Sequence, residues 1–417
     1  MQLTPDWPGP RTQMESLMPR SGLRKAAAFL VVGICSAALA ITVVGVTGTS
    51  LRTDAAGTRD YVAYWAAGQQ LAHHANPYDR TAILGLERSA GYAHKYPALM
   101  MRNPPTALLL VLPLGYLGPR TGELLWSLFL FACLFASVRM VWTIQGRPKS
   151  KVHLLGYSFG PALLCIEAGQ MGLVVLLGLT CFLRWHGSRP FLAGVSLWLC
   201  MLKPHLFVPF GTVLLAWVVV TRSYNILAGV ALALGVSVAA ALILDPLVWA
   251  HYGRMLRVDQ VDRSTNPWLT IMLRRSIDPN ARWLQYLPAA LGCVWGLAYY
   301  RRHRAEWDWM AHGSLLTLVS LAVAPYAWIT DQAILVPAVL NAAYVSRSQS
   351  VLGALALASA IIELGVLKGA QPFHSAFFVW TAPAWLAWYV WAIRFGGREG
   401  SLPSVVALPI SSEETSL

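Results

Sequence analysis

A polar stretch that directly follows the first apolar segment of this chain contains residues that could do chemistry. It reads DYVAYWAAGQQLAHHANPYD and begins with Asp60, which Tyr64 and Trp65 follow at helical spacing. This spacing predicts a short helix in a membrane interface, where aromatic side chains are common. Asp60 could simply complement the dipole at the start of that helix. It could also act as a general base beside a wall of aromatic side chains that stacks on a sugar, because a carboxylate near a low-dielectric boundary binds protons more tightly.

Two other aspartates and a pair of histidines lie near this stretch. Asp79 falls in the turn sequence NPYD and is expected to have a structural role, whereas Asp54 is a competing candidate for the base. His73 and His74 are adjacent and lack the spacing of a metal-binding motif, so we expect no zinc site there.

Three short polar corners further along the chain carry most of the other candidates. Lys203, in MLKPH, could extend to the membrane surface or bind an anionic group, with His205 beside it. Gln170, in EAGQMG, could donate a hydrogen bond to a sugar hydroxyl or a phosphate oxygen. Asp331, in APYAWITD, follows Tyr326 and could cap the next helix or bind hydroxyl groups.

Arginines add positive charge to the same part of the sequence. Arg102 precedes a pair of prolines in MMRNPP, and arginine matches phosphate groups with two parallel hydrogen bonds. Most of the arginines between residues 254 and 275 are expected to meet solvent or lipid headgroups, although one or two of them could also hold a phosphate.

Composition defines the class of protein that must position these side chains. Hydrophobic residues make up 56% of the 417 residues and charged residues 12%, whereas soluble domains carry about 25% charged residues. Several apolar runs are long enough to cross a bilayer, so the chain is expected to be an all-α polytopic membrane protein. The net charge of +13 comes from small basic clusters between these runs, which argues against nucleic-acid binding. All six cysteines lie in apolar runs without metal-ligand spacing.

The hydrophobic pattern predicts twelve membrane spans. A further apolar run at 104–118 is short and broken by prolines, so we expect it to re-enter the membrane or lie in the interface. The basic loops GRPKSK, RWHGSR, TRSYN and RRHR then share the cytoplasmic side with the N-terminal arginines. Loops 49–120 and 247–283 and the three polar corners fall on the opposite, extracytoplasmic side. The expected spans are 26–48, 121–143, 152–168, 171–186, 191–203, 205–221, 224–246, 284–300, 310–326, 332–346, 350–368 and 376–396.

The two ends of the chain differ in composition from the region between them. Residues 1–23 and 398–417 are polar and are expected to form disordered cytoplasmic tails around one transmembrane domain at 24–397. The first apolar run continues past the small residues CSAALA, which predicts an uncleaved anchor.

The order of the polar segments along the chain is itself informative. DYVAYWAAGQQLAHHANPYD, NPPTALLLVLPLGYLGPRTGELLW, EAGQMGLVVLLGL, AGVSLWLCMLKPHLFVP and APYAWITDQAILVP follow one another between about residues 60 and 340. In this order they resemble family 87 of the GT-C membrane glycosyltransferases, which includes mannosyltransferases that use polyprenol-phosphate-mannose. The chain departs from related patterns in two places: the first loop has no Asp-x-Asp pair, and Arg102 stands where an aromatic residue is expected.

The resemblance implies a GT-C-like fold with interfacial or re-entrant helices in the first outer loop. It also implies that an acid in that loop, here Asp60, is the catalytic base. Lys203 matches the Lys-Pro of the family and would contact the donor phosphate, and Gln170 matches its Gly-Gln. By position, we assign Arg102 and His205 to the phosphate and Tyr64, Trp65, Gln170, Tyr326 and Asp331 to the sugar or acceptor.

The expected function is therefore that of a hexosyltransferase in the bacterial inner membrane. It would move a hexose, with mannose expected, from a polyprenyl-phosphate donor to a glycolipid or glycan acceptor on the periplasmic face, with inversion. The sequence has no P-loop or Rossmann glycine pattern, so we expect no cofactor, and a metal requirement stays open. A secondary transporter with twelve spans is the main alternative, although the two halves of the chain are unlike. A non-catalytic lipid-binding or assembly protein is the third possibility.

Overall fold

The computed structural model of the chain is all-helical in the part that it describes. No residue there belongs to a β-strand, and helices form most of that part. The expected span at 26–48, the two expected tails and Asp54 lie outside the described residues, apart from two isolated helical positions. The described residues are 33, 40, 60–91, 97–258, 268–346, 348–367 and 376–396.

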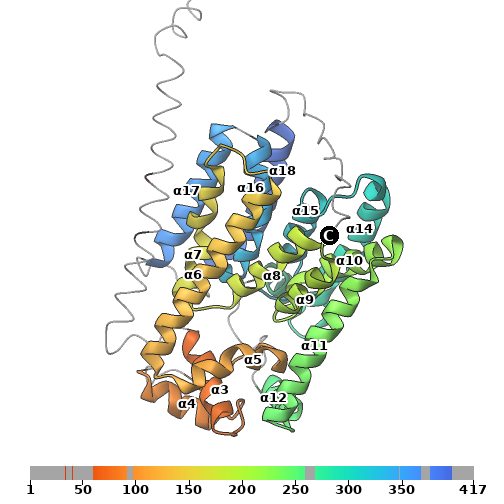
Figure 1. Cartoon of the computed structure of the whole chain (residues 1–417). Coiled ribbons are helices and arrows are strands. Elements are labelled where there is room, and N and C mark those ends of the chain that lie inside the picture. Colours follow the sequence, from red (N-terminus) through yellow and green to blue (C-terminus); the bar gives the residue numbers. More distant parts are fainter. Residues whose placement is uncertain are drawn as a thin grey trace, which may run out of the picture.

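Each of the other expected spans contains a helix close to its predicted position. These helices form the main body in Figure 1, with the C-terminal helices drawn in blue packed beside α6 and α7. They are α6 (Pro119–Ile144), α7 (Gly160–Ala168), α8 (Gly172–Trp185), α9 (Pro190–Cys200), α10 (Val208–Thr221), α11 (Tyr224–Leu244), α14 (Trp283–His303), α15 (His312–Ala322), α16 (Val336–Ser346), α17 (Gln349–Leu367) and α18 (Thr381–Gly396).

Several of these helices are too short to cross a membrane alone, so twelve complete spans are not confirmed. Five helices in the described residues are long and apolar enough to cross. By contrast, α8 has 14 residues and α9 has 11. At 1.5 Å per residue, 14 residues rise only about 21 Å, less than the ~30 Å hydrocarbon core. Figure 1 shows the long helices α6 and α11 extending beyond α7, α8 and α9, whose ends form corners inside the molecule.

The first outer loop folds into a helical layer at one end of this body (Figure 1). It contains α3 (Tyr61–Ala72) and α4 (Arg80–Ser89), so the expected short helix after Asp60 is present. The apolar run 104–118 is no single crossing helix, as its prolines suggested. It is divided into η2 (Pro105–Ala107), α5 (Leu108–Val111) and η3 (Leu112–Tyr116).

The α3 helix and η3 meet at backbone contact. A Cβ added to Gly115 would lie 2.1 Å from the Gly68 carbonyl oxygen, so only glycine fits at this crossing. Trp65 Nε1 donates to the Leu117 carbonyl at 2.9 Å, and Gln69 Nε2 donates to the same oxygen at 3.3 Å. These contacts fix the position of the helix that follows Asp60.

Asp79 has the structural role expected of it. Its side chain caps the start of α4 by accepting hydrogen bonds from the backbone N–H groups of Thr81 and Ala82, at 2.9 and 3.1 Å. Further along α4, the buried Glu87 carboxyl accepts the Leu99 N–H at 3.0 and 3.1 Å. This bond ties the segment that precedes Arg102 to the outer layer.

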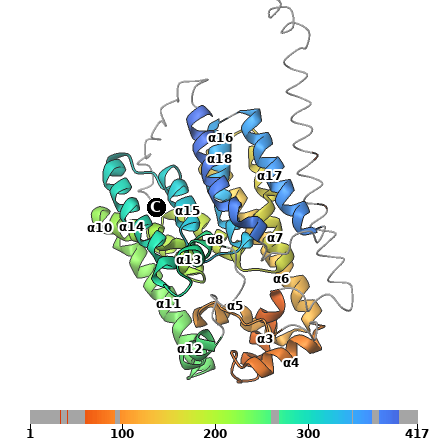
Figure 2. The same ribbon diagram turned by 180° about the vertical axis from the view of Figure 1, so that it is seen from behind.

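The second outer loop contains two helices that the hydrophobic pattern did not predict. They are α12 (Val248–Val258) and α13 (Leu269–Ile277), and α12 lies at the same end as the first loop in Figure 2. Tyr252 of α12 packs on Tyr78 with ring centroids 5.4 Å apart and donates its hydroxyl to the Arg102 carbonyl at 3.0 Å. The two outer loops are therefore in direct contact with each other.

The glycine crossing leads to the first prediction. Gly115→Ala is expected to lower the stability by about 1–3 kcal/mol, because the new methyl group must push η3 away from α3. Gly85→Ala, on the exposed side of α4, is the matched control, since nothing lies within 4 Å of its added Cβ. The apparent melting temperature in detergent, followed with a thiol-reactive dye that detects the buried cysteines, measures both variants. Equal melting temperatures for the two variants would show that the crossing contributes nothing.

Candidate active site

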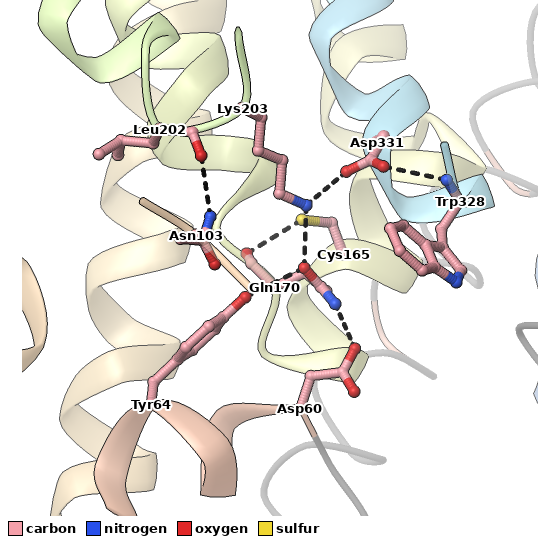
Figure 3. Close-up of polar contacts among 9 residues, drawn as sticks. All are labelled: Asp60, Tyr64, Asn103, Cys165, Gln170, Leu202, Lys203, Trp328 and Asp331. Carbon is pink, nitrogen blue, oxygen red and sulfur yellow. Dashed lines mark hydrogen bonds and ion pairs between the residues drawn. The ribbon is translucent and has the colours of Figure 1, made fainter. Parts of the chain in front are cut away.

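Three corners between short helices meet the start of α3 at one place (Figure 3). The first corner carries Gln170, between α7 and α8, and the second carries Lys203, before η5 (Pro204–Phe207). The third carries Asp331, in η8 (Ile329–Leu335). Because these helices end inside the molecule, their polar corner residues converge there together with Asp60.

Gln170 is the centre of the hydrogen-bond network in Figure 3. Its Oε1 accepts from Lys203 Nζ at 3.0 Å and from Tyr64 Oη at 3.1 Å. Its Nε2 donates to Asp60 Oδ2. A single amide therefore connects the candidate base to the candidate phosphate-binding lysine.

Lys203 and Asp331 form a buried ion pair, with Nζ and Oδ1 2.5 Å apart. Lys203 is 6% exposed and Asp331 0% exposed, so the lysine does not extend to a membrane surface. Asp331 Oδ2 also accepts the Trp328 N–H at 2.9 Å and thus caps η8, one of the two roles considered from the sequence. Burying this lysine is feasible because its charge is balanced and hydrogen-bonded.

The turn before Gln170 depends on a glycine. Gly169 has φ of +69°, a left-handed conformation, and a Cβ there would lie 2.7 Å from Tyr61 Cβ. Its carbonyl accepts the indole N–H of Trp126 at 2.8 Å. The corner is therefore pressed against α3, which brings the Gln170 side chain to Asp60.

A cavity of about 670 Å³ adjoins the network. The structure brings most of the sequence candidates to its walls, since Asp60, Tyr64, Arg102, Gln170, Lys203, His205 and Tyr326 all line it. Residues that the sequence did not single out complete the walls. They are Ala63, Arg80, Pro97, Ala98, Leu99, Met100, Met101, Asn103, Pro104, Leu202, Pro204, Tyr252, Val258 and Trp328.

Two candidates do not reach the cavity. Trp65 is buried and its indole N–H is bonded to the Leu117 carbonyl, so it holds the outer layer together. Asp331 lies behind Lys203 and lines no part of the cavity wall. Their placement therefore does not match the direct sugar or acceptor contacts assigned to them from the sequence.

The opposite wall of the cavity is aromatic and polar. His205 stacks on Tyr326 with ring centroids 4.0 Å apart and planes inclined by 22°. Within the described part of the chain, His205 Nε2 is buried without a hydrogen-bond partner. Asn103 Nδ2 donates to the Leu202 carbonyl at 3.0 Å and joins the outer loop to the Lys203 corner. The stacked pair offers a flat surface with one unused ring nitrogen.

The environment of Asp60 favours a protonated carboxyl at a higher pH than usual. Burial raises the pKa of Asp60 above its ordinary value of 3.8 and is the largest influence. The hydrogen bond from Gln170 and the charge of Lys203 act against this rise, whereas Asp331 adds to it. A raised pKa in a carboxylate that lines a cavity suits a general base.

No group of three or more His, Cys, Asp or Glu side chains in the described residues could hold a metal ion. Lys203 has three N–H donors. Gln170 and Asp331 engage two of them. In the described part of the chain, the wall of this cavity thus carries a lysine, an arginine and a histidine together with one carboxylate.

The apolar helices, with the outer layer and the polar cavity beneath it, are those of a polytopic membrane protein. Comparison with known families makes the identification more specific: the model of glycosyltransferase family 87 matches residues 102–367. The chain belongs to this family and is a membrane glycosyltransferase, as the order of its motifs indicated. No curated protein and no solved structure matches the chain.

The ion pair behind the cavity leads to the second prediction. Lys203→Met leaves a buried carboxylate without its counter-ion and is expected to cost about 3–5 kcal/mol. Asp331→Asn retains an acceptor for the Trp328 N–H but leaves the lysine unpaired, with a similar cost. The double variant should melt at a higher temperature than either single variant, because no unpaired charge stays buried.

A second aspartate provides the control for this comparison. Asp245 pairs with His251 at 2.7 Å, and their side chains are more exposed. Asp245→Asn should therefore cost less than about 1 kcal/mol. If the Lys203 and Asp331 single variants melt like the parent protein, the pair is not buried from water as described.

Proposed function

We propose that this glycosyltransferase moves a hexose, with mannose as the first candidate, from a polyprenyl-phosphate sugar to a hydroxyl group of a glycolipid or glycan. The observation that supports this most is that Asp60 and Lys203 line the same cavity. A base for the acceptor and cations for a departing phosphate are the two requirements of such a transfer.

The donor phosphate is proposed to lie near Lys203 and Arg102. Among the described residues, Gln170 and Asp331 are the acceptors of Lys203 Nζ, and Arg102 and His205 line the same cavity. Fixed donors of this kind stabilise the charge that develops on the leaving phosphate, more strongly in a site that excludes water. The apolar side chains of Leu99 and Met101 on the cavity wall suit the first units of a lipid tail.

Asp60 is proposed to act on the acceptor. It would take the proton of the attacking hydroxyl while the hydroxyl oxygen forms a bond to the anomeric carbon. The bond from that carbon to the phosphate oxygen breaks in the same step, and the electron pair leaves with the polyprenyl phosphate. One in-line displacement inverts the anomeric configuration. Tyr64 and Tyr326 line the same cavity and would contact the sugar.

The cavity is proposed to face the periplasm of a bacterial inner membrane. Basic loops such as RWHGSR and RRHR connect the helix ends remote from the three polar corners. The positive-inside rule places such short basic loops in the cytoplasm. A donor carried by a membrane lipid could reach an extracytoplasmic site without any soluble nucleotide sugar.

Removing the proposed base gives the third prediction. Asp60→Asn is expected to lower the transfer rate by about 10²–10⁴-fold, the usual contribution of a general base. The purified variant would be incubated with a panel of polyprenyl-phosphate sugars and an acceptor glycolipid, and donor consumption followed by mass spectrometry. Asp79→Asn, in the same loop, is the matched control, because asparagine caps helices as well as aspartate. An Asp60→Asn protein that keeps its activity within tenfold of the parent would remove Asp60 from this role.

The environment of Asp60 gives the fourth prediction, on pH dependence. A general base works only when ionised, so kcat/KM should fall as the pH drops through the pKa of Asp60. Because burial raises this pKa, the acid limb is expected at a pH above 3.8, the ordinary value for aspartate. A pH–rate profile of the parent protein measures this. An acid limb at or below the ordinary value would argue that Asp60 is solvated or is not the base.

A further inference from the structure

Gln170 has no assigned role in the proposed reaction beyond a possible contact with the sugar, yet its side chain is almost fully committed to protein partners. Its Oε1 has two donors, Lys203 and Tyr64, at 3.0 and 3.1 Å. Its Nε2 faces Asp60 Oδ2. A side chain held on both ends in this way is more suited to positioning a neighbour than to binding a substrate.

The orientation of the Gln170 amide is determined by chemistry. The Lys203 ammonium can only donate hydrogen bonds, so the amide atom that faces it must be the oxygen. The other end of the amide, which faces Asp60, must then be the NH₂ group. Asp331 fixes Lys203 in turn, through the buried ion pair at 2.5 Å. The direction of the hydrogen bond to Asp60 is thus set by a carboxylate on a different corner of the fold.

We propose that Gln170 is a positioning residue for the base, held by Lys203 and Asp331 so that its amide fixes the Asp60 carboxylate in one orientation as a hydrogen-bond acceptor. This inference rests on the proposed function. It gives Lys203 a second role besides contact with the phosphate.

The position of the second carboxylate oxygen fits this role. Asp60 lines the cavity, and no described residue forms a hydrogen bond to its Oδ1. With Oδ2 held by the amide, Oδ1 is left to accept the proton of an incoming hydroxyl group. The charged and titratable groups around this carboxylate are Lys203, Asp331 and Tyr64, and among the described residues the Gln170 amide is its one hydrogen-bond donor.

Two substitutions separate positioning from substrate contact. Gln170→Met keeps the length of the side chain but removes the N–H donor, which allows the carboxylate to rotate. We expect kcat to fall about tenfold to a hundredfold, the usual effect of a misplaced catalytic group, while the donor KM stays within about threefold.

Gln170→Glu keeps the acceptor for Lys203 and Tyr64 but places a carboxylate oxygen against Asp60. Both variants should move the acid limb of the pH–rate profile to higher pH, and Gln170→Glu should move it further.

A matched control lies at the same corner. The Cys165 thiol donates to the Gln170 backbone carbonyl at 3.2 Å rather than to its side-chain amide. Cys165→Ala therefore perturbs the same turn but should leave the acid limb at the parent position. A shift as large in this control as in Gln170→Met would mean that any disturbance of the corner moves the limb, and the proposal would be overturned.

A second measurement does not depend on sugar transfer. A water-soluble carbodiimide with an amine labels protonated carboxyl groups, so labelling of the Asp60 peptide falls as the pH rises through the pKa of Asp60. Mass spectrometry of that peptide at several pH values should give a midpoint at higher pH in both Gln170 variants. Unchanged midpoints, or a raised donor KM with an unmoved acid limb, would make Gln170 a substrate contact and overturn the inference. If Asp60→Asn is active, the proposed base is wrong, and the labelling still decides whether Gln170 holds Asp60.

Discussion

The buried ion pair between Lys203 and Asp331 is the interaction on which the rest of the site depends. A lysine inside an apolar helical body is tolerated only beside an opposite charge with good hydrogen-bond geometry. Once the lysine is fixed, it orients the Gln170 amide, and the amide meets Asp60. The contacts therefore run from Asp331, which does not line the cavity, through Lys203 and Gln170 to Asp60, the proposed base.

The short length of α7, α8 and α9 allows this network to form inside the molecule. Had α7, α8 and α9 crossed the full width of a bilayer, their polar corners would lie in water outside it. Because they end early, the corners meet inside the molecule, and the outer layer of α3, η2, α5 and η3 covers them (Figure 1). This chain thus forms a polar cavity at helix ends, where backbone groups are already available for hydrogen bonding.

The sequence predicted the helical class, the family and the approximate positions of the helices in the described spans, because long apolar runs and basic loops are strong signals. It did not predict α12 and α13 of the second outer loop. It also selected Asp60, Gln170 and Lys203, each a polar residue at the edge of an apolar run. It did not reveal that these residues bond to each other, since such contacts join segments more than thirty residues apart. It assigned Trp65 to the sugar, whereas the indole is buried against η3 and donates to the Leu117 carbonyl, a contact between segments about fifty residues apart. Hydropathy also does not show where a helix ends within the apolar layer.

The separation between the two ion-paired residues has a consequence for biosynthesis. Asp331 follows Lys203 by 128 positions, which a ribosome working at about 5–20 residues per second needs roughly 6–26 s to add. Throughout that interval the ammonium group lacks its counter-ion and must keep access to water or to the translocation machinery. The pocket can close only when η8 docks beside α7 and α8. In a nascent chain released before that point, Gln170 would face a lysine that has no carboxylate to hold it.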